Sequence, residues 1–146
     1  MNHHLILRVV TKILIPPILL FALYVQFHGD YGPGGGFQAG VIFAAAFVLY
    51  ALIFGLDAAN DVAPPHIVRG FTAIGLLLYI GVGIWGLVLG APFLDYGVLA
   101  HDPIHGQHYG ILLVEGGVGI TVASTMITIF TYFAEHGRLP KEGDDD

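Results

Sequence analysis

The chain has 146 residues, of which 55% are hydrophobic and only 11% are charged, and its mean hydropathy is +0.77. A soluble domain carries about 25% charged residues, so this chain has too little charge to coat a water-soluble globule. Its net charge of −6, its five Lys and Arg residues and its lack of cysteine exclude a nucleic-acid-binding protein, a disulfide scaffold and a thiolate metal site. We therefore expect an integral membrane protein that works as one component of a larger assembly.

Four stretches are long and apolar enough to cross a bilayer core, which needs about 20 residues of helix. They cover residues 5–27, 37–56, 68–89 and 111–133. Only short connections lie between them. We predict an all-α membrane protein with a single four-helix transmembrane domain over residues 1–146, in which residues 134–146 form a short acidic tail.

All five basic residues fall on one side of the predicted bundle. They are Arg8, Lys12, Arg69, Arg138 and Lys141. Because Lys and Arg are enriched in cytoplasmic segments, we predict that both termini, the acidic tail and the 57–67 connection face the cytoplasm. The 29–36 and 90–110 connections would then face outward.

The most distinctive segment is a Gly/Pro-rich turn before the second predicted span. Its residues are Pro33, Gly34, Gly35, Gly36 and Phe37. Consecutive glycines allow positive φ angles and close approach of the backbone to another surface. Small residues then recur every fourth position through Gly40 to Ala44, a stripe on which a neighbouring helix can pack. Two interpretations stay open: a packing turn, or an unwound segment that lines an ion path.

Glu115 is the one carboxylate placed within a predicted span, about one turn inside the outer end of residues 111–133. A charge at membrane depth costs about 2.5–3.5 kcal/mol on insertion scales, so such groups usually pair or line water paths. We expect Glu115 to be either a relay point for a proton or cation, or an interfacial glutamate. In the second case it would bond to the 90–110 connection or to a partner subunit.

Hydroxyl side chains form a stripe on the fourth predicted span. They are Thr121, Ser124, Thr125, Thr128 and Thr131. At about 100° per residue they cluster within a third of the helix circumference, roughly opposite Glu115, so the two features should face different neighbours. The hydroxyls either bond back to the helix and hold helices together, or line a hydrated path.

Three histidines, His101, His105 and His108, enrich the longest predicted connection. Their spacing matches no rigid metal-binding motif, so we expect a solvated loop, or one that seals against a partner, and no metal site. His28 is expected to form a cap or hydrogen bond near the membrane interface. We expect no cofactor and no catalysis, because the chain offers neither a nucleophile–base pair nor a cofactor cradle.

The PGGGF motif of residues 33–37 continues as PGGGFQAGVIFAA, and with it the chain resembles the MrpB/MnhB family, whose members are small subunits of the Mrp-type multisubunit Na⁺/H⁺ antiporters. The resemblance covers about residues 8–134 and extends to related subunits of membrane-bound hydrogenases. It implies a multi-pass subunit in a bacterial or archaeal cell membrane. Its partners would be large subunits similar to the proton-pumping subunits of respiratory complex I, with further small subunits, and Na⁺ and H⁺ would be the transported ions.

The resemblance also implies that Pro33 and Phe37 are functionally sensitive, together with the glycines between them. Three hypotheses follow for this chain. It contributes to the cation path, with the PGGGF backbone and Glu115 lining a cavity between subunits; or it only assembles the complex; or it serves a hydrogenase-type complex. Further candidates for the path or for assembly are His28, Asp30, Thr121, Thr125 and Thr128.

Overall fold

The structure is a computed structural model that describes residues 2–29, 32–100 and 102–137. In these ranges every regular element is helical. The elements are α1 (Asn2–Phe27), α2 (Gly36–Phe54), α3 (Leu56–Val62), α4 (Pro65–Val88), the 3-10 helix η1 (Tyr96–Leu99) and α5 (Pro103–His136). Four of them, α1, α2, α4 and α5, are long and apolar enough to cross a membrane. The prediction of an all-helical chain with four candidate spans is thus confirmed.

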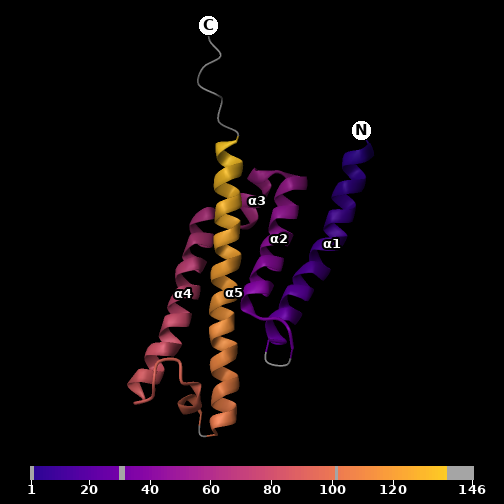
Figure 1. The fold of residues 1–146 in the computed structure, drawn as a ribbon. Coiled ribbons are helices and arrows are strands. Elements are labelled where there is room, and N and C mark those ends of the chain that lie inside the picture. Colours follow the sequence, from indigo (N-terminus) through magenta and orange to yellow (C-terminus); the bar gives the residue numbers. More distant parts are fainter. Residues whose placement is uncertain (1, 30–31, 101, 138–146) are drawn as a thin grey trace.

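The four long helices lie side by side with α5 at the centre of the packing (Figure 1). Helix α5 packs most extensively against α4 and α2, whereas α1 packs mainly against α2. The start of α1, the end of α5 and the short helix α3 lie at one end of the bundle, and the α1–α2 connection and η1 lie toward the other. The two connections that carry the candidate residues are therefore at the same end.

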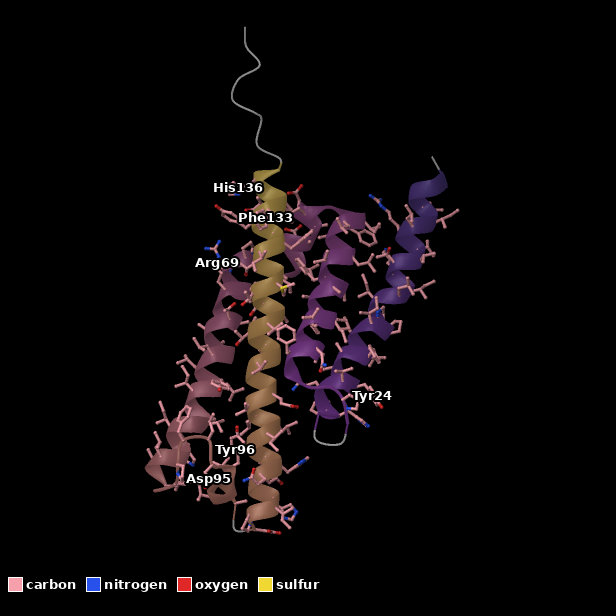
Figure 2. The ribbon with its side chains drawn as sticks, viewed as in Figure 1. Tyr24, Arg69, Asp95, Tyr96, Phe133 and His136 are labelled. Atoms are coloured by element: carbon pink, nitrogen blue, oxygen red, sulfur yellow. The ribbon has the colours of Figure 1, made fainter. Side chains whose placement is uncertain are left out.

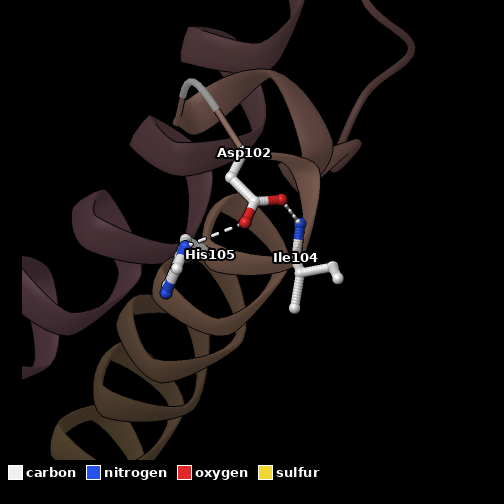
Figure 3. A network of polar contacts seen from close by, with 3 residues as sticks. All are labelled: Asp102, Ile104 and His105. Atoms are coloured by element: carbon white, nitrogen blue, oxygen red, sulfur yellow. Dashed lines mark hydrogen bonds and ion pairs between the residues drawn. The ribbon is translucent and has the colours of Figure 1, made fainter.

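Helix α5 begins at Pro103, earlier than the predicted residue 111, and is 34 residues long. The hydropathy pattern gave a later start because residues 103–110 include two histidines and a glutamine, which lower the mean hydropathy. The actual start has a cap: the Asp102 side chain accepts a hydrogen bond from the Ile104 N–H at 3.1 Å, and proline occupies the first turn (Figure 3). The predicted 90–110 loop is therefore partly helical. The helix also continues to His136, beyond the predicted residue 133, and residues 138–146 of the predicted tail lie outside the described ranges.

The connection between α2 and α4 holds a helix that the sequence analysis did not predict. Helix α2 ends at Phe54 because Gly55 adopts a φ of 96°, a conformation that residues with a side chain rarely take. The chain then forms α3, and Pro64 and Pro65 begin α4 three residues before the predicted position 68.

The internal core is small. It centres on Ala44, Val68 and Ile127, with Phe47 and Ala63 packed against them. No large side chain in the described ranges is completely buried, and only 11–28% of the most apolar window of each span is buried inside the chain. Most of the apolar surface faces outward, as expected of helices that meet lipid or neighbouring subunits.

Helix η1 packs on the first turns of α5 (Figure 2). A Cβ at Gly110 would overlap the ring of Tyr96, so η1 depends on glycine at that position of α5. Asp95 caps η1 by accepting a hydrogen bond from the Gly97 N–H at 3.1 Å. Burial raises the pKa of the Tyr96 phenol above its usual value of 10.0, and Tyr79 adds to the shift.

Candidate functional site

The carboxyl group of Glu115 lies against the turn that precedes α2. A Cβ at Gly29 would lie 2.6 Å from Glu115 Oε1, and a Cβ at Gly35 would lie 3.0 Å from the same oxygen. Both distances are shorter than ordinary van der Waals contact, so the carboxyl group occupies space that only glycine leaves free. The structure thus brings together two features that are far apart in the sequence and that the first of the three hypotheses assigned to one path.

Glu115 lies deeper in its helix than predicted. Because α5 begins at Pro103, the carboxylate is about three turns, or about 18 Å, from the start of the helix rather than one turn. The α1–α2 connection accordingly meets α5 well within its length, whereas η1 meets its first turns (Figure 1).

Gly35 has a backbone conformation that only glycine adopts easily, with φ 145° and ψ −178°. Its carbonyl accepts a hydrogen bond from the Ala39 N–H at 3.0 Å, which closes the first turn of α2. Gly35 therefore has two functions in the local structure. It directs the chain into α2, and it leaves room for the Glu115 carboxyl group.

Gly36 and Gly40 bring the backbone of α2 directly onto the backbone of α5. A Cβ at Gly36 would lie 3.0 Å from Gly119 N, and a Cβ at Gly40 would lie 2.6 Å from Gly119 O and 3.1 Å from Ala123 N. Residue numbers increase in the same direction along both helices, so α2 and α5 run parallel. Close backbone approach through small residues is a common way for membrane helices to associate, and the glycine stripe packs in this way.

Pro33 and Phe37 flank the glycines with exposed side chains, and Phe37 is 63% exposed. Gly34 faces inward, where its Cβ would lie 3.3 Å from the carbonyl oxygen of Val25 at the end of α1. The backbone of the turn therefore contacts α1 and α5, whereas the side chains of Pro33 and Phe37 face outward. An exposed aromatic ring at a helix start offers a contact surface to lipid or to another subunit.

Gln26 is a polar residue near this site that the sequence analysis missed. Its Oε1 approaches α5 so closely that a Cβ at Gly119 would lie 2.5 Å from it. Its Nε2 is buried, and no described residue accepts a hydrogen bond from it. The available signal was an amide near the end of a predicted span, similar to the signal that identified Glu115.

A groove of about 530 Å³ runs beside the site between α1, α2, α4 and α5. Its lining is mostly apolar, and Gln26 and Ser124 are its polar members. Gly116 and Gly119 of α5 also line it, so the groove lies next to Glu115 on the same helix. In a bilayer, an apolar groove of this kind accepts a lipid chain or a helix ridge of a neighbour.

The hydroxyl groups of α5 face α4 rather than the glycine turn. The Thr72 hydroxyl donates to Ser124 Oγ at 2.9 Å, and the Ser124 hydroxyl donates to the Ile120 carbonyl at 2.6 Å. A Cβ at Gly75 would overlap Thr121, so the two helices are in close contact here. This contact supports the interpretation that the hydroxyls hold the helices together.

Two further hydroxyls bond back to their own helix. Thr121 and Thr128 each donate to the carbonyl four residues earlier at 2.8 Å. Thr131 is buried and Thr125 is half-buried. The stripe therefore lies on a different side of α5 from the contact with the turn, as the helical spacing predicted.

The histidines near the start of α5 do not gather into a site. His105 Nδ1 lies 3.1 Å from Asp102 Oδ2 in an exposed pair one turn apart (Figure 3). His108 is exposed on the same helix, and His101 lies outside the described residues. Across residues 2–29, 32–100 and 102–137, no three His, Cys, Asp or Glu side chains could hold a metal ion.

The remaining polar candidate, His28, directly follows the last residue of α1. The ring of His28 stacks on that of Tyr24, with the centroids 4.4 Å apart, so the histidine is held at the edge of the turn. Tyr24 itself is labelled in Figure 2. The Gly32 N–H donates to the His28 carbonyl at 3.1 Å. Asp30 lies outside the described residues.

Comparison with known proteins gives consistent matches over most of the chain. Residues 6–128 match the model of a family described as a domain related to the MnhB subunit of Na⁺/H⁺ antiporter. The chain is also similar to the protein assigned as antiporter subunit mnhB2 in Staphylococcus aureus strains Newman, JH1 and COL. The identity is 35% over 131 residues, which are 88% of this chain and 92% of each relative.

Proposed function

The chain belongs to the family of domains related to the MnhB subunit of Na⁺/H⁺ antiporters, and from this premise we propose that it is a small membrane subunit of a multisubunit antiporter. We further propose that Glu115 and the glycine turn lie on the cation or proton path between subunits. The observation that carries this second step is the placement of the Glu115 carboxyl group directly against Gly29 and Gly35. The family match favours an antiporter over a hydrogenase-type complex, and a transporter component over an enzyme.

The physical argument rests on what surrounds the carboxylate. An ionisable group at membrane depth is expensive unless it pairs or meets water. Here the neighbouring residues of the turn are glycines, which add no side-chain bulk, and Pro33 and Phe37 on the far side of the turn are exposed. A carboxylate that lies against glycine backbone can exchange a proton or a cation when a neighbouring subunit supplies the other wall.

A second role, assembly of the complex, is supported by a separate observation. Gly36 and Gly40 place α2 against the backbone of α5, and the outward apolar surface of all four spans is available to lipid or partners. The two roles use adjacent residues. The two roles can be separated by mutation. The ion path would use the side-chain charge of Glu115, whereas the contact with Gly36 uses only the Glu115 backbone.

The decisive experiment replaces Glu115 by Gln in the intact complex, because this change removes the charge and keeps the size. Na⁺-dependent proton movement is measured in everted vesicles, and assembly is measured on the same membranes by native gel. We expect Glu115→Gln to lose antiport at least about 100-fold while the complex assembles, and Glu115→Asp to keep part of it. The exposed neighbour Gln38 provides the control, and Gln38→Ala should keep normal antiport.

The possible results separate the two roles. Normal antiport in Glu115→Gln would remove Glu115 from the path. Loss of the assembled complex would make the residue structural. Loss of transport with an intact complex supports the path.

We also propose that the chain is a single four-helix domain in the bacterial or archaeal cell membrane with both ends in the cytoplasm. The support is the one-sided distribution of Lys and Arg and the position of α3 at the same end as the start of α1 (Figure 1). The chain has no cysteine, so Asp61→Cys and Ala100→Cys provide single labels at opposite ends. An impermeant thiol reagent added to whole cells should label position 100 and not position 61. The opposite result inverts the orientation.

A further inference from the structure

Two cationic side chains of α1 lie over one aromatic ring at the end of α2. The Arg8 guanidinium carbon is 5.8 Å from the centroid of the Phe54 ring, and the Lys12 Nζ is 5.6 Å from the same centroid. Both side chains are exposed, and they lie on one face of α1 because they are one turn apart. The structure therefore concentrates two positive charges on one small surface.

Neither cation forms a close ion pair with a described carboxylate. Among the described side chains, one ion pair is shorter than 4.0 Å, and it joins His105 to Asp102 at the other end of the bundle. Arg8 and Lys12 take no part in it. A cation over an aromatic ring gains about 0.5–1 kcal/mol at an exposed position, but the ring does not cancel the charge. Two such cations that share one ring form a favourable place for an anion.

The position of this surface along the helices suggests which anion it meets. Phe54 is the last residue of α2, and Arg8 and Lys12 lie about one and about two turns inside the candidate span of α1, which begins at Leu5. Their long side chains carry the charged groups to Phe54, at the end of the apolar stretch of α2. This is the level of the phospholipid headgroups, where basic residues near helix ends bind anionic lipids. The adjoining part of α1 is covered by little protein: only 11% of its apolar window is buried, and Leu5, Ile6 and Val9 are at least half exposed.

We propose that Arg8, Lys12 and Phe54 form a binding site for the phosphate group of an anionic phospholipid. The Arg8 guanidinium group would bind two phosphate oxygens, and the Lys12 ammonium group would bind a third oxygen. The lipid chains would lie along the exposed apolar side of α1. The site is independent of the proposed ion path, because it lies at the other end of α1 from the glycine turn (Figure 1). Its effect is to attach the least covered helix of the bundle to the membrane.

The test uses the intact complex, stripped of lipid in neutral detergent and titrated with phosphatidylglycerol under native mass spectrometry. Replacing both Arg8 and Lys12 by Gln should weaken the tightest phosphatidylglycerol site about 30-fold, or about fivefold for each charge. Arg69→Gln is the matched control for a single change, because Arg69 is an exposed cation at the same end of the bundle (Figure 2), and it should leave that site unchanged. Zwitterionic phosphatidylcholine should not compete.

Several outcomes would overturn the proposal. Unchanged phosphatidylglycerol affinity in the double variant would exclude the site. Equal competition by inorganic phosphate would make it a site for soluble anions rather than lipid. If the double variant does not assemble, Arg8→Gln and Lys12→Gln are measured singly. Unchanged phosphatidylglycerol affinity in both single variants would also contradict the proposal.

Discussion

The two faces of α5 are packed by different chemistry. Toward α2, the contact is backbone on backbone, with Gly36 and Gly40 against Gly119, and it includes the Glu115 carboxyl group. Toward α4, the contact combines close approach at Gly75 with hydroxyls, and the hydrogen bond from Thr72 to Ser124 joins the helices.

The difference between the faces shows how one helix can carry an ionisable group and remain well packed. On the α4 face, the Thr72 and Ser124 hydroxyls find acceptors inside the chain, so these groups are satisfied without a partner. On the α2 face, the carboxylate lies beside a turn whose Pro33 and Phe37 side chains point outward. We therefore expect changes on the α2 face to affect transport and assembly, and changes on the α4 face to affect only stability.

The largest effect should come from Gly36→Val. The added side chain would overlap the carbonyl group of Glu115 and lie against Gly119 N, and neither backbone group can move aside within a helix. Such overpacking should destabilise the fold by about 3 kcal/mol, and the subunit should disappear from the assembled complex on a native gel. Gly70→Ala is the control, because Gly70 has open space around it and alanine favours helix. Normal amounts of complex with Gly36→Val would contradict the close contact of α2 with α5.

A smaller effect is expected from Gly35→Ala. The methyl group would strain a φ of 145° and crowd Glu115 Oε1 at 3.0 Å, at about 1–3 kcal/mol in local stability. Antiport in vesicles should fall strongly while most of the complex still assembles. Gly32→Ala, in the same turn but with open space, should leave antiport unchanged. Equal loss in the two variants would mean that the turn is sensitive in general and not through Glu115.

The smallest effect should come from Thr72→Val, which removes the hydroxyl donor and keeps the shape. The hydrogen bond to Ser124 is a single contact between membrane helices, worth about 0.6 kcal/mol on average. Thermal unfolding of the complex should begin at a slightly lower temperature, and antiport should be unchanged. A transport defect here would make the hydroxyl stripe a path candidate again.

The features that depend on local pattern could be predicted from the sequence. Hydropathy located four spans, and the 100° spacing of α5 placed its hydroxyls away from Glu115. The start of α5 could also have been predicted, because Asp102 and Pro103 are a cap and a first-turn proline. The hydropathy pattern hid that signal, because the first turns of this helix include His105, Gln107 and His108.

The contact between Glu115 and the glycine turn could not be predicted in the same way. It depends on the position of α1 and α2 along the axis of α5. The residue pattern within one helix does not determine where a neighbouring helix lies along it. The contact of Gln26 with Gly119 has the same origin. Composition can indicate that small residues pack closely, but the partner of each glycine follows from the three-dimensional arrangement.

The small core has a consequence for how the cell makes this subunit. With no large side chain completely buried in the described ranges and at most 28% of any span's apolar window covered, little of the folding free energy arises within the chain. In a copy without partners, the glycine contacts and the surroundings of Glu115 should open more often. The subunit should then be degraded by membrane proteases. The amount of this subunit should therefore follow the amount of its partners, so that protein degradation, rather than synthesis, sets the stoichiometry of the complex.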